Sequence, residues 1–409
     1  MNPSASPAPQ AIRPALFLAV MLAIHAPSTL AASEGDVFGL NIGQSFSYDD
    51  NVFRIPDESL PQGYSQQDDL ISYTTVRGEM NKSFGRQRVY GDLGATQAKY
   101  QEFTRLDHQS YQGFLAWRMG FGTASEAGAF YRRSRAMSNF DESITWSGRN
   151  MLTTETYGGD VLLRIAGDWL GVASVTQAEN RNSLEEFRSG ESRVDAYDAG
   201  VRYAPRTGNY VELRYRRSVY DYFNRSGSND YSYNQDELRL NSRWVASGRS
   251  TLDSGISLVR SRHENLDYLD FTGLAGYVAY RFKPTGATTI ETRLARDVGS
   301  VGDGWGSYAK TTGLSVSPSW QATAKLELSG EVAYRHRKFD GYQALSSGNV
   351  VNDNSDRTDR IQVLRMAAKH AVTPDLSLNL GLRYEKRDSN QNTYDFIDRQ
   401  VTLSAFYRF

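Results

Sequence analysis

Apolar and polar residues alternate along much of this chain, and the clearest alternation lies in its last twelve residues, 398–409. One parity of this segment holds Val401, Leu403, Ala405, Tyr407 and Phe409, whereas the other parity is mostly polar. Successive residues of a β-strand point to opposite faces, so such a segment has one apolar and one polar face. A helix would place the same residues on both of its sides, and the pattern therefore predicts a strand.

The same alternation recurs through the body of the chain, in segments that include 111–121, 157–165, 211–216, 237–244, 326–335 and 376–385. Short stretches rich in turn-forming residues lie between strands, at 81–85, 123–127, 166–169, 205–208, 247–250, 283–286, 321–325 and 372–375. Longer polar stretches alternate with them, at 181–192, 221–232, 298–307, 340–357 and 388–395. Long strands joined alternately by short turns and long loops are typical of a transmembrane β-barrel.

We therefore expect an all-β protein, a transmembrane antiparallel up-and-down β-barrel of about 18 strands. Its short turns and both chain ends would lie on the periplasmic side, and its longer loops would be extracellular. Two faint strands, 70–80 and 359–371, leave about 16 strands as the alternative. A propeller would also repeat at about forty residues, but each propeller repeat holds short strands rather than two long ones. A soluble sandwich would explain the terminal strand alone but not the repeat.

The composition agrees with a barrel more than with a large soluble core. Only 39% of the 409 residues are hydrophobic, and this set is rich in aromatics, with 25 Tyr, 18 Phe and 6 Trp. A barrel needs apolar side chains only on its lipid-facing half, because its interior is polar. The chain has no Cys, which excludes disulfides and thiolate metal sites, and its net charge of −1 gives no argument for nucleic acid.

The amino terminus has the pattern of a secretory signal peptide. Arg13 precedes an apolar run over 15–24, and the small residues Ala31 and Ala32 follow it. We expect residues 1–32 to be cleaved and 33–409 to form the barrel, with an uncleaved anchor as the alternative. No stretch approaches the 18 or so apolar residues that a membrane-spanning helix needs.

The polar parities of the expected strands carry a mixed set of Arg and acidic residues, which we expect to line the lumen. They are Arg118, Asp198, Arg202, Glu212, Arg214, Arg216, Glu237, Arg239, Arg243, Glu291, Arg293, Glu327, Glu331, Arg335, Arg383 and Glu385. Arg suits multi-donor recognition of carboxylates and sugar hydroxyls, so the set favours a conduit for a hydroxyl-rich or charged solute. In the alternative interpretation, cross-strand Arg–Glu pairs neutralise each other and only hold the wall together.

Other candidate chemistry is sparse, and we expect no enzyme, cofactor or metal. His263 and Glu264 begin a zinc-binding pattern, but position 267 is Asp instead of His. Two acidic pairs, Asp49–Asp50 and Asp68–Asp69, fall in the first expected outer loop. We expect them to be solvated loop residues, with a cation site or an acid pair for catalysis as the alternative. The aromatics Trp117, Tyr157, Trp169, Trp244, Trp320 and Tyr407 are expected at the membrane interfaces rather than along a sugar track.

Two segments of the sequence resemble those of known outer-membrane proteins. The terminal Tyr407 and Phe409 resemble the assembly signal of Gram-negative outer-membrane proteins. The segment Asp49, Asp50, Asn51, Val52, Phe53 and Arg54, followed by a turn with Gly85, Arg86 and Arg88, resembles the β-barrel porin type-2 family. Within that family the likeness is closest to EpsL-type outer-membrane proteins of exopolysaccharide and exosortase (PEP-CTERM) gene clusters. It covers roughly residues 37–122, implies an outer-membrane barrel serving polysaccharide synthesis or export, and transfers no catalytic residues.

The expected function is a non-catalytic outer-membrane pore or conduit linked to exopolysaccharide, located in the Gram-negative outer membrane. Its expected partners are outer-membrane lipid, a polysaccharide or sugar solute and the barrel-assembly machinery, and nucleic acid is not among them. The alternatives are a general small-solute porin, a barrel enzyme that modifies polysaccharide or lipid, and a purely structural or adhesive barrel.

Overall fold

The computed structural model describes residues 37–409 except 58, 62, 141–147, 206, 228–229, 301–307, 341–343, 347–348 and 352–356. The expected signal peptide, residues 1–32, lies outside the described residues. Within them, no helix has the length and apolar character needed to cross a bilayer.

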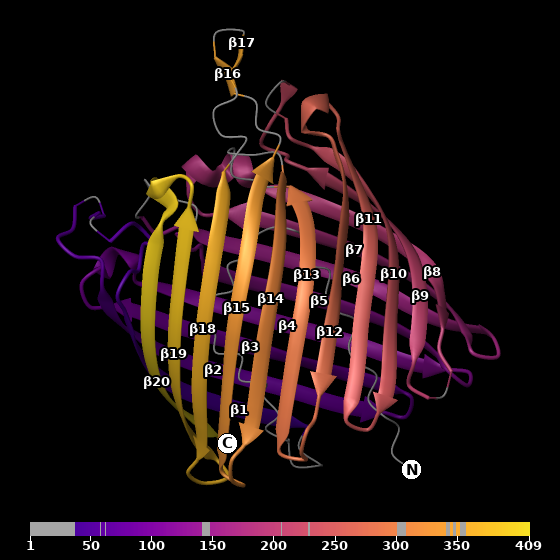
Figure 1. Ribbon diagram of the computed structural model, residues 1–409. Coiled ribbons are helices and arrows are strands. Elements are labelled where there is room, and N and C mark those ends of the chain that lie inside the picture. The colour runs from indigo at the N-terminus through magenta and orange to yellow at the C-terminus, as the bar shows by residue number, and fades with distance from the viewer. Residues whose placement is uncertain are drawn as a thin grey trace.

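One large sheet contains eighteen strands, and it accounts for nearly all of the regular structure (Figure 1). Its strands are β1 (Phe38–Asp49), β2 (Asp69–Phe84), β3 (Gln87–Tyr100), β4 (His108–Phe121), β5 (Ser125–Met137), β6 (Met151–Ala166), β7 (Trp169–Asn182), β8 (Ser192–Tyr203), β9 (Tyr210–Asp221), β10 (Tyr233–Ser247), β11 (Ser250–His263), β12 (Phe271–Phe282), β13 (Thr288–Ser300), β14 (Tyr308–Gln321), β15 (Leu326–Asp340), β18 (Thr358–Ala371), β19 (Leu376–Ser389) and β20 (Phe396–Arg408). The two faint strands of the sequence are β2 and β18. The expectation of 18 strands is thus confirmed, and the alternative of 16 is wrong.

The sheet closes on itself. Each strand pairs antiparallel with its sequence neighbour in the sheet, and β1 pairs with β20 from Asn41 opposite Arg408 to Asp49 opposite Gln400. The last residue continues the closure, because the Phe409 amide donates to the Leu40 carbonyl at 2.9 Å. A closed antiparallel barrel satisfies its backbone hydrogen bonds internally and leaves no sheet edge, as a membrane-spanning sheet must.

The two ends of the barrel differ as expected. Short turns join β2 to β3, β4 to β5 and β6 to β7, and each contains a glycine with positive φ: Gly85 (58°), Gly122 (60°) and Gly167 (52°). The opposite end carries the long connections, whose fully described 3-10 helices are η1 (Thr104–Leu106), η2 (Glu185–Gly190), η4 (Asp267–Leu269) and η5 (Asn392–Tyr394). A small hairpin of β16 (Ala344–Ser346) and β17 (Asn349–Val351) projects from this end, far from the C-terminus (Figure 1).

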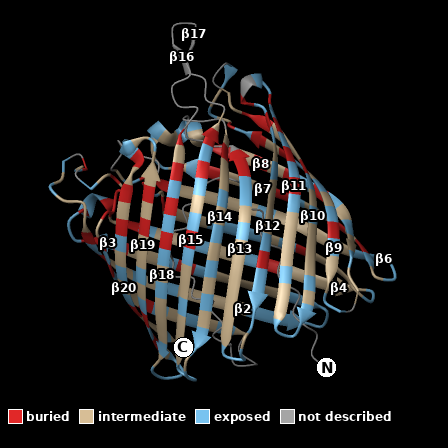
Figure 2. Cartoon of the chain, in the orientation of Figure 1, coloured by how far each residue is buried: buried red, intermediate tan, exposed pale blue. Residues whose placement is uncertain are grey.

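Burial follows the parity of the sequence pattern (Figure 2). On β10, for example, Leu238 and Leu240 point outward and are 48% and 43% exposed. Their neighbour Glu237 points inward and is 7% exposed. Apolar side chains therefore cover the middle of the barrel's outside, and charged side chains at that depth face inward, the reverse of a soluble fold. Such an outer face is stable only against lipid, which confirms the expected outer-membrane location of the barrel.

Large aromatics mark the periplasmic rim. Trp169, Trp244, Trp320 and Tyr407 lie close to the short-turn ends of their strands and are each at least 44% exposed. Trp117 lies near the end of β4 and donates its indole N–H to Gln87 Oε1 at 3.0 Å. Amphipathic rings prefer the headgroup depth, so these positions fit an interfacial girdle. Tyr157 belongs to the other half of the barrel, seven residues into β6.

Candidate functional site

Inward-facing charges of β8 and β9 form one interlocked network. Arg214 binds Asp198 at 2.9 Å and Glu212 at 2.7 Å. Arg202 binds the same Glu212 at 2.6 Å, and Arg216 binds Asp198 at 3.0 Å. Both carboxylates are nearly buried while the three guanidinium groups stay partly exposed, so the exposed part of this network is cationic.

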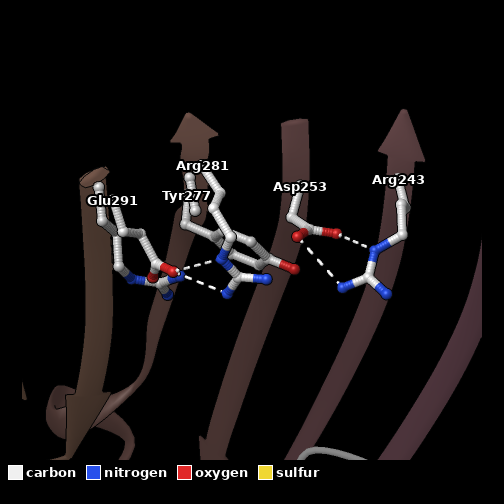
Figure 3. Close-up of a pocket in the computed structure, with 7 residues that line it drawn as sticks. Arg243, Asp253, Tyr277, Arg281 and Glu291 are labelled. Atoms are coloured by element: carbon white, nitrogen blue, oxygen red, sulfur yellow. Dashed lines mark hydrogen bonds and ion pairs between the residues drawn. The ribbon is translucent and has the colours of Figure 1, made fainter. Parts of the chain in front are cut away.

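The network continues onto β10 to β13, where it borders a small recess in the wall (Figure 3). The recess has a volume of about 70 Å³ and is lined by Arg243, Asp253, Tyr277, Ala279, Arg281, Glu291 and Arg293. Arg243 pairs with Asp253 at 2.6 Å on one side, and Arg281 pairs with Glu291 at 2.7 Å on the other. Glu237 and Arg239 pair at 2.6 Å on the neighbouring β10.

Arg293 differs from its neighbours in this strip. Its guanidinium carbon lies 4.3 Å from the centroid of the Tyr277 ring, and it makes no ion pair with any described residue. Tyr210 has a similar place between two cations, at 4.8 Å from Arg202 and 5.9 Å from Arg243. Ring faces attract cations without neutralising them, so the Arg293 guanidinium, held by Tyr277, keeps its charge available to attract a solute anion.

The remaining candidates lie on other parts of the wall. Arg118 of β4 pairs with Asp160 of β6 at 2.9 Å. Glu331 pairs with Arg365, and Arg383 pairs with Glu385, on β15, β18 and β19. Glu327 and Arg335 share the inward parity of β15 and have no ion-pair partner among the described residues. The expected residues thus line the barrel in separate groups, and only those of β8 to β13 form a continuous strip.

Several residues of the strip escaped the sequence analysis. Asp253, Tyr277 and Arg281 share the inward parity of their strands, and parity was the signal that could have found them. Their partners could not be predicted, because the pairing depends on register: Arg243 lies directly opposite Asp253, and Arg281 lies directly opposite Glu291.

The family-like segment builds the outer mouth of the barrel. The Asn51 side chain donates to the carbonyls of Ile55 at 2.7 Å and Ile397 at 2.9 Å, which ties the segment to β20. Arg54 adopts φ of 54° and lies 3.2 Å from both Asp49 and Asp398. The likeness therefore falls on residues that shape the mouth.

An apolar cluster holds this segment in place. Phe53 is 1% exposed, and its ring centroid lies 4.8 Å from that of Phe103 and 4.9 Å from that of Phe140. Tyr64 packs on the same cluster, where burial raises the pKa of its phenol and the nearby Arg105 guanidinium opposes that shift. The cluster includes residues at the outer ends of β2, β3, β5 and β6 and so ties the segment to these strands.

The acidic pairs are not the solvated loop residues that we expected. Asp49 ends β1 at 4% exposure, and Asp69 begins β2 at 1% exposure. Asp69 accepts backbone N–H groups of Gln101, Glu102 and Phe103, so it anchors the β3–β4 connection. Asp50 pairs with Arg399 at 3.0 Å, and Asp68 accepts the Tyr48 hydroxyl at 3.0 Å. These carboxylates accept hydrogen bonds or form ion pairs at the strand ends, and the sequence alone does not reveal those partners.

The alternative of a cation site is met by a cationic side chain of the protein itself. Carboxylate oxygens of Asp49, Asp50 and Asp398 lie within 4.8 Å of one another. The Arg54 guanidinium lies among them and supplies the positive charge that a metal ion would bring. The turn residues of the family-like motif are structural as well: Gly120 donates to the Arg86 carbonyl at 2.9 Å, and Arg88 donates to Asn81 at 2.8 Å.

The closed sheet, apolar exterior and charged interior together define an outer-membrane β-barrel. No protein-family model matches the chain, and no curated protein sequence matches it either. Solved structures do. The chain is similar to the outer membrane protein OpdK of Pseudomonas aeruginosa, with a TM-score of 0.52 and 13% identity over 91% of this chain and 99% of that one. A BenF-like porin of Pseudomonas fluorescens Pf-5 gives a TM-score of 0.50 and 11% identity, with the same coverage. These likenesses concern the fold.

Proposed function

We propose that the barrel is a non-catalytic pore for small polar solutes, with a preference for anions. The observation that carries the proposal is the cationic strip on β8 to β13. Its buried carboxylates are shared among partly exposed guanidinium groups, and Arg293 has no ion-pair partner among the described residues. A wall with one sign of excess charge raises the local concentration of the opposite ion.

Planar-bilayer recordings of the purified protein test this function. We expect discrete conductance steps and a reversal potential that favours chloride over potassium in a salt gradient. Arg293→Gln removes the unpaired charge and should lower the anion-to-cation permeability ratio about twofold, since a single charge a few ångströms away is worth up to about 1 kcal/mol in water. The matched control is Arg360→Gln on β18, an exposed residue on the outward parity, which should leave the ratio unchanged.

The proposal would be contradicted if the protein showed no conductance, or if Arg293→Gln left the anion-to-cation permeability ratio unchanged. Liposome swelling with neutral sugars of increasing size then separates a small-solute pore from a polymer conduit. OpdK has also been solved with vanillate, which is a small carboxylate and a suitable first charged probe.

The link to exopolysaccharide is a second proposal, and it rests on the resemblance over residues 37–122. Asn51, Phe53 and Arg54, which carry the resemblance, hold the mouth of the barrel together, and this shared role at the mouth supports the link. The composition of surface polymer in a deletion strain tests it: unchanged polymer would remove this link and leave the small-solute pore.

The enzyme hypothesis loses its best candidates. Asp49 and Asp50 bind Arg54 and Arg399, and Asp68 and Asp69 bind a tyrosine hydroxyl and backbone amides. Carboxylates committed to such contacts are poor general acids or bases. Among the described residues we therefore identify no group suited to catalysis.

A further inference from the structure

The outer surface of β5 to β8 carries charge at one end only. Tyr131 and Tyr157 lie directly opposite each other and point outward, with 40% and 47% exposure. The next outward positions toward the long loops are Arg133 and Glu155, about 7 Å further along the strands. In the row of the tyrosines, Asp195 of β8 lies opposite Gln177 of β7; between this row and the short turns, the outward positions of the four strands hold no charged residue.

A compact group of charges follows above the tyrosines, and we call it the outer-rim cluster: Arg133, Glu155, Glu179, Arg181 and Arg193. Glu155 and Glu179 lie directly opposite each other on β6 and β7, an arrangement of like charges that is unfavourable unless cations surround it. Arg133 lies 4.0 Å from Glu155, Arg193 lies 3.1 Å from Glu179, and Arg181 also pairs with Glu179.

The cluster surrounds a depression in the surface, and its guanidinium groups remain partly exposed although they form these ion pairs. A depression of about 240 Å³ is lined by Arg133, Thr153, Glu155, Glu179 and Arg181. The side chains of Arg133, Arg181 and Arg193 are 49%, 62% and 42% exposed. Arg135, opposite Thr153 at the edge of the depression, has no ion pair with a described residue. At the depression itself, the guanidinium groups of Arg133, Arg135 and Arg181 thus outnumber the carboxylates of Glu155 and Glu179.

The position of the cluster indicates what it faces. Exposed tyrosines on a barrel exterior lie at the membrane interface, so charges one outward position beyond them lie at headgroup depth. The long-loop end faces away from the periplasm, so these headgroups belong to the outer leaflet. Arg binds phosphate with paired N–H donors, and carboxylates accept hydrogen bonds from sugar hydroxyl groups.

We propose that the outer-rim cluster is a binding site for the phosphorylated sugar headgroup of an outer-leaflet glycolipid. The guanidinium groups of Arg133, Arg181 and Arg135 hold the phosphate, and Glu155 and Glu179 accept hydroxyl groups of the same headgroup. The acyl chains then run down the apolar surface below Tyr131 and Tyr157. This site lies on the outside of the barrel and is independent of conduction through the lumen.

The test uses the full mature chain in detergent and a bis-phosphorylated lipid A as the probe, with bound lipid counted by native mass spectrometry. The double variant Arg133→Ala/Arg181→Ala should bind at least about tenfold more weakly, because two charge-assisted contacts are removed. The matched control is Arg132→Ala, which changes the neighbouring residue of the same strand; Arg132 faces inward and stacks on Phe114 at 5.0 Å. This control should bind as the unchanged protein does, and electrophoresis without heating verifies that all variants are folded.

Three further measurements decide which molecule occupies the outer-rim cluster. Arg133→Lys/Arg181→Lys keeps the charges and should recover part of the binding, and the same lipid without phosphates should bind far more weakly to the unchanged protein. Equal binding of the two lipids, or of the double alanine variant and the control, would overturn the proposal. Light scattering of the lipid-free protein is the last measurement. If the unchanged protein is an oligomer and the double alanine variant is a monomer, the cluster is a contact between copies of the chain, and the proposal is overturned.

Discussion

At the scale of single residues, Arg54 is the most constrained side chain of the mouth. Among the described residues it is the only non-glycine residue with positive φ, a conformation that costs an L-residue about 1–2 kcal/mol. Its guanidinium bridges Asp49 and Asp398, which are 4% and 0% exposed. The ion pairs offset the backbone strain, and they join the first strand of the barrel, β1, to the last, β20.

Replacing Arg54 should therefore destabilise the barrel. Arg54→Ala leaves the buried Asp49 and Asp398 carboxylates next to each other, with Arg383 at 3.4 Å from Asp398, and we expect the free energy of unfolding to fall by about 3–5 kcal/mol. Urea unfolding of the protein in lipid vesicles, followed by tryptophan fluorescence, measures this loss. Arg399→Ala is the matched control, because its pair with Asp50 is on the same rim but its side chain is 64% exposed, and it should cost less than about 1 kcal/mol. Equal losses for both variants would show that the bridge is not a buried pair.

At the scale of elements, the close approach of β8 and β9 makes the cationic network. A Cβ atom added to Gly200 would lie 2.1 Å from the Leu213 carbonyl oxygen and 2.8 Å from the Arg214 Cα atom. The bare glycine thus lets the Arg214 side chain cross β8 and reach Asp198. A strand-interior glycine is normally a weakness, and here it has a packing reason.

Gly200→Ala should push the two strands apart. We expect a loss of about 1–3 kcal/mol in unfolding free energy, as for other overpacked sites. Gly94→Ala is the matched control on the inward parity of β3, where the nearest atom to the added Cβ is the Gln112 side chain at 3.5 Å. It should be neutral or slightly stabilising, because alanine is less flexible than glycine when unfolded. Urea midpoints of the two variants compare the sites, and an unchanged midpoint for Gly200→Ala would contradict the account.

At the scale of the whole molecule, the barrel is inside-out with respect to a soluble protein. Exposed leucines and valines occupy the middle of nearly every strand on the outward parity, and inward positions carry Arg and acidic residues. The favourable burial of those apolar side chains comes from lipid tails and not from a protein core.

Adjacent positions of β14 test this arrangement. Leu314 points outward at mid-strand with 48% exposure, and Ser315 points inward. Leu314→Arg should cost about 2–4 kcal/mol in lipid vesicles, the cost of a charge facing the bilayer midplane. Ser315→Arg should cost much less, because the interior is polar. Were the leucine change harmless, Leu314 would face water and the membrane arrangement would be wrong.

How much the sequence can predict is clear from these same residues. Period-two alternation places Leu314 outside and Ser315 inside without any knowledge of neighbours, because side-chain direction in a strand is a local property. The number of strands and the two kinds of connection follow in the same way. The inward candidates of β8 to β13 were found by this rule, and Asp253, Tyr277 and Arg281 obey it too.

What the amino-acid sequence by itself determined, then, is the set of strands and the side of the wall on which each residue lies. Only the tertiary structure decided which inward charges meet, because cross-strand register and barrel closure join residues far apart in the chain. Asn51 binds the Ile397 carbonyl across 346 residues, and Arg54 meets Asp398 beside it. The acidic pairs thereby became anchors of the mouth, since a carboxylate's partners depend on the fold and not on its neighbours in sequence.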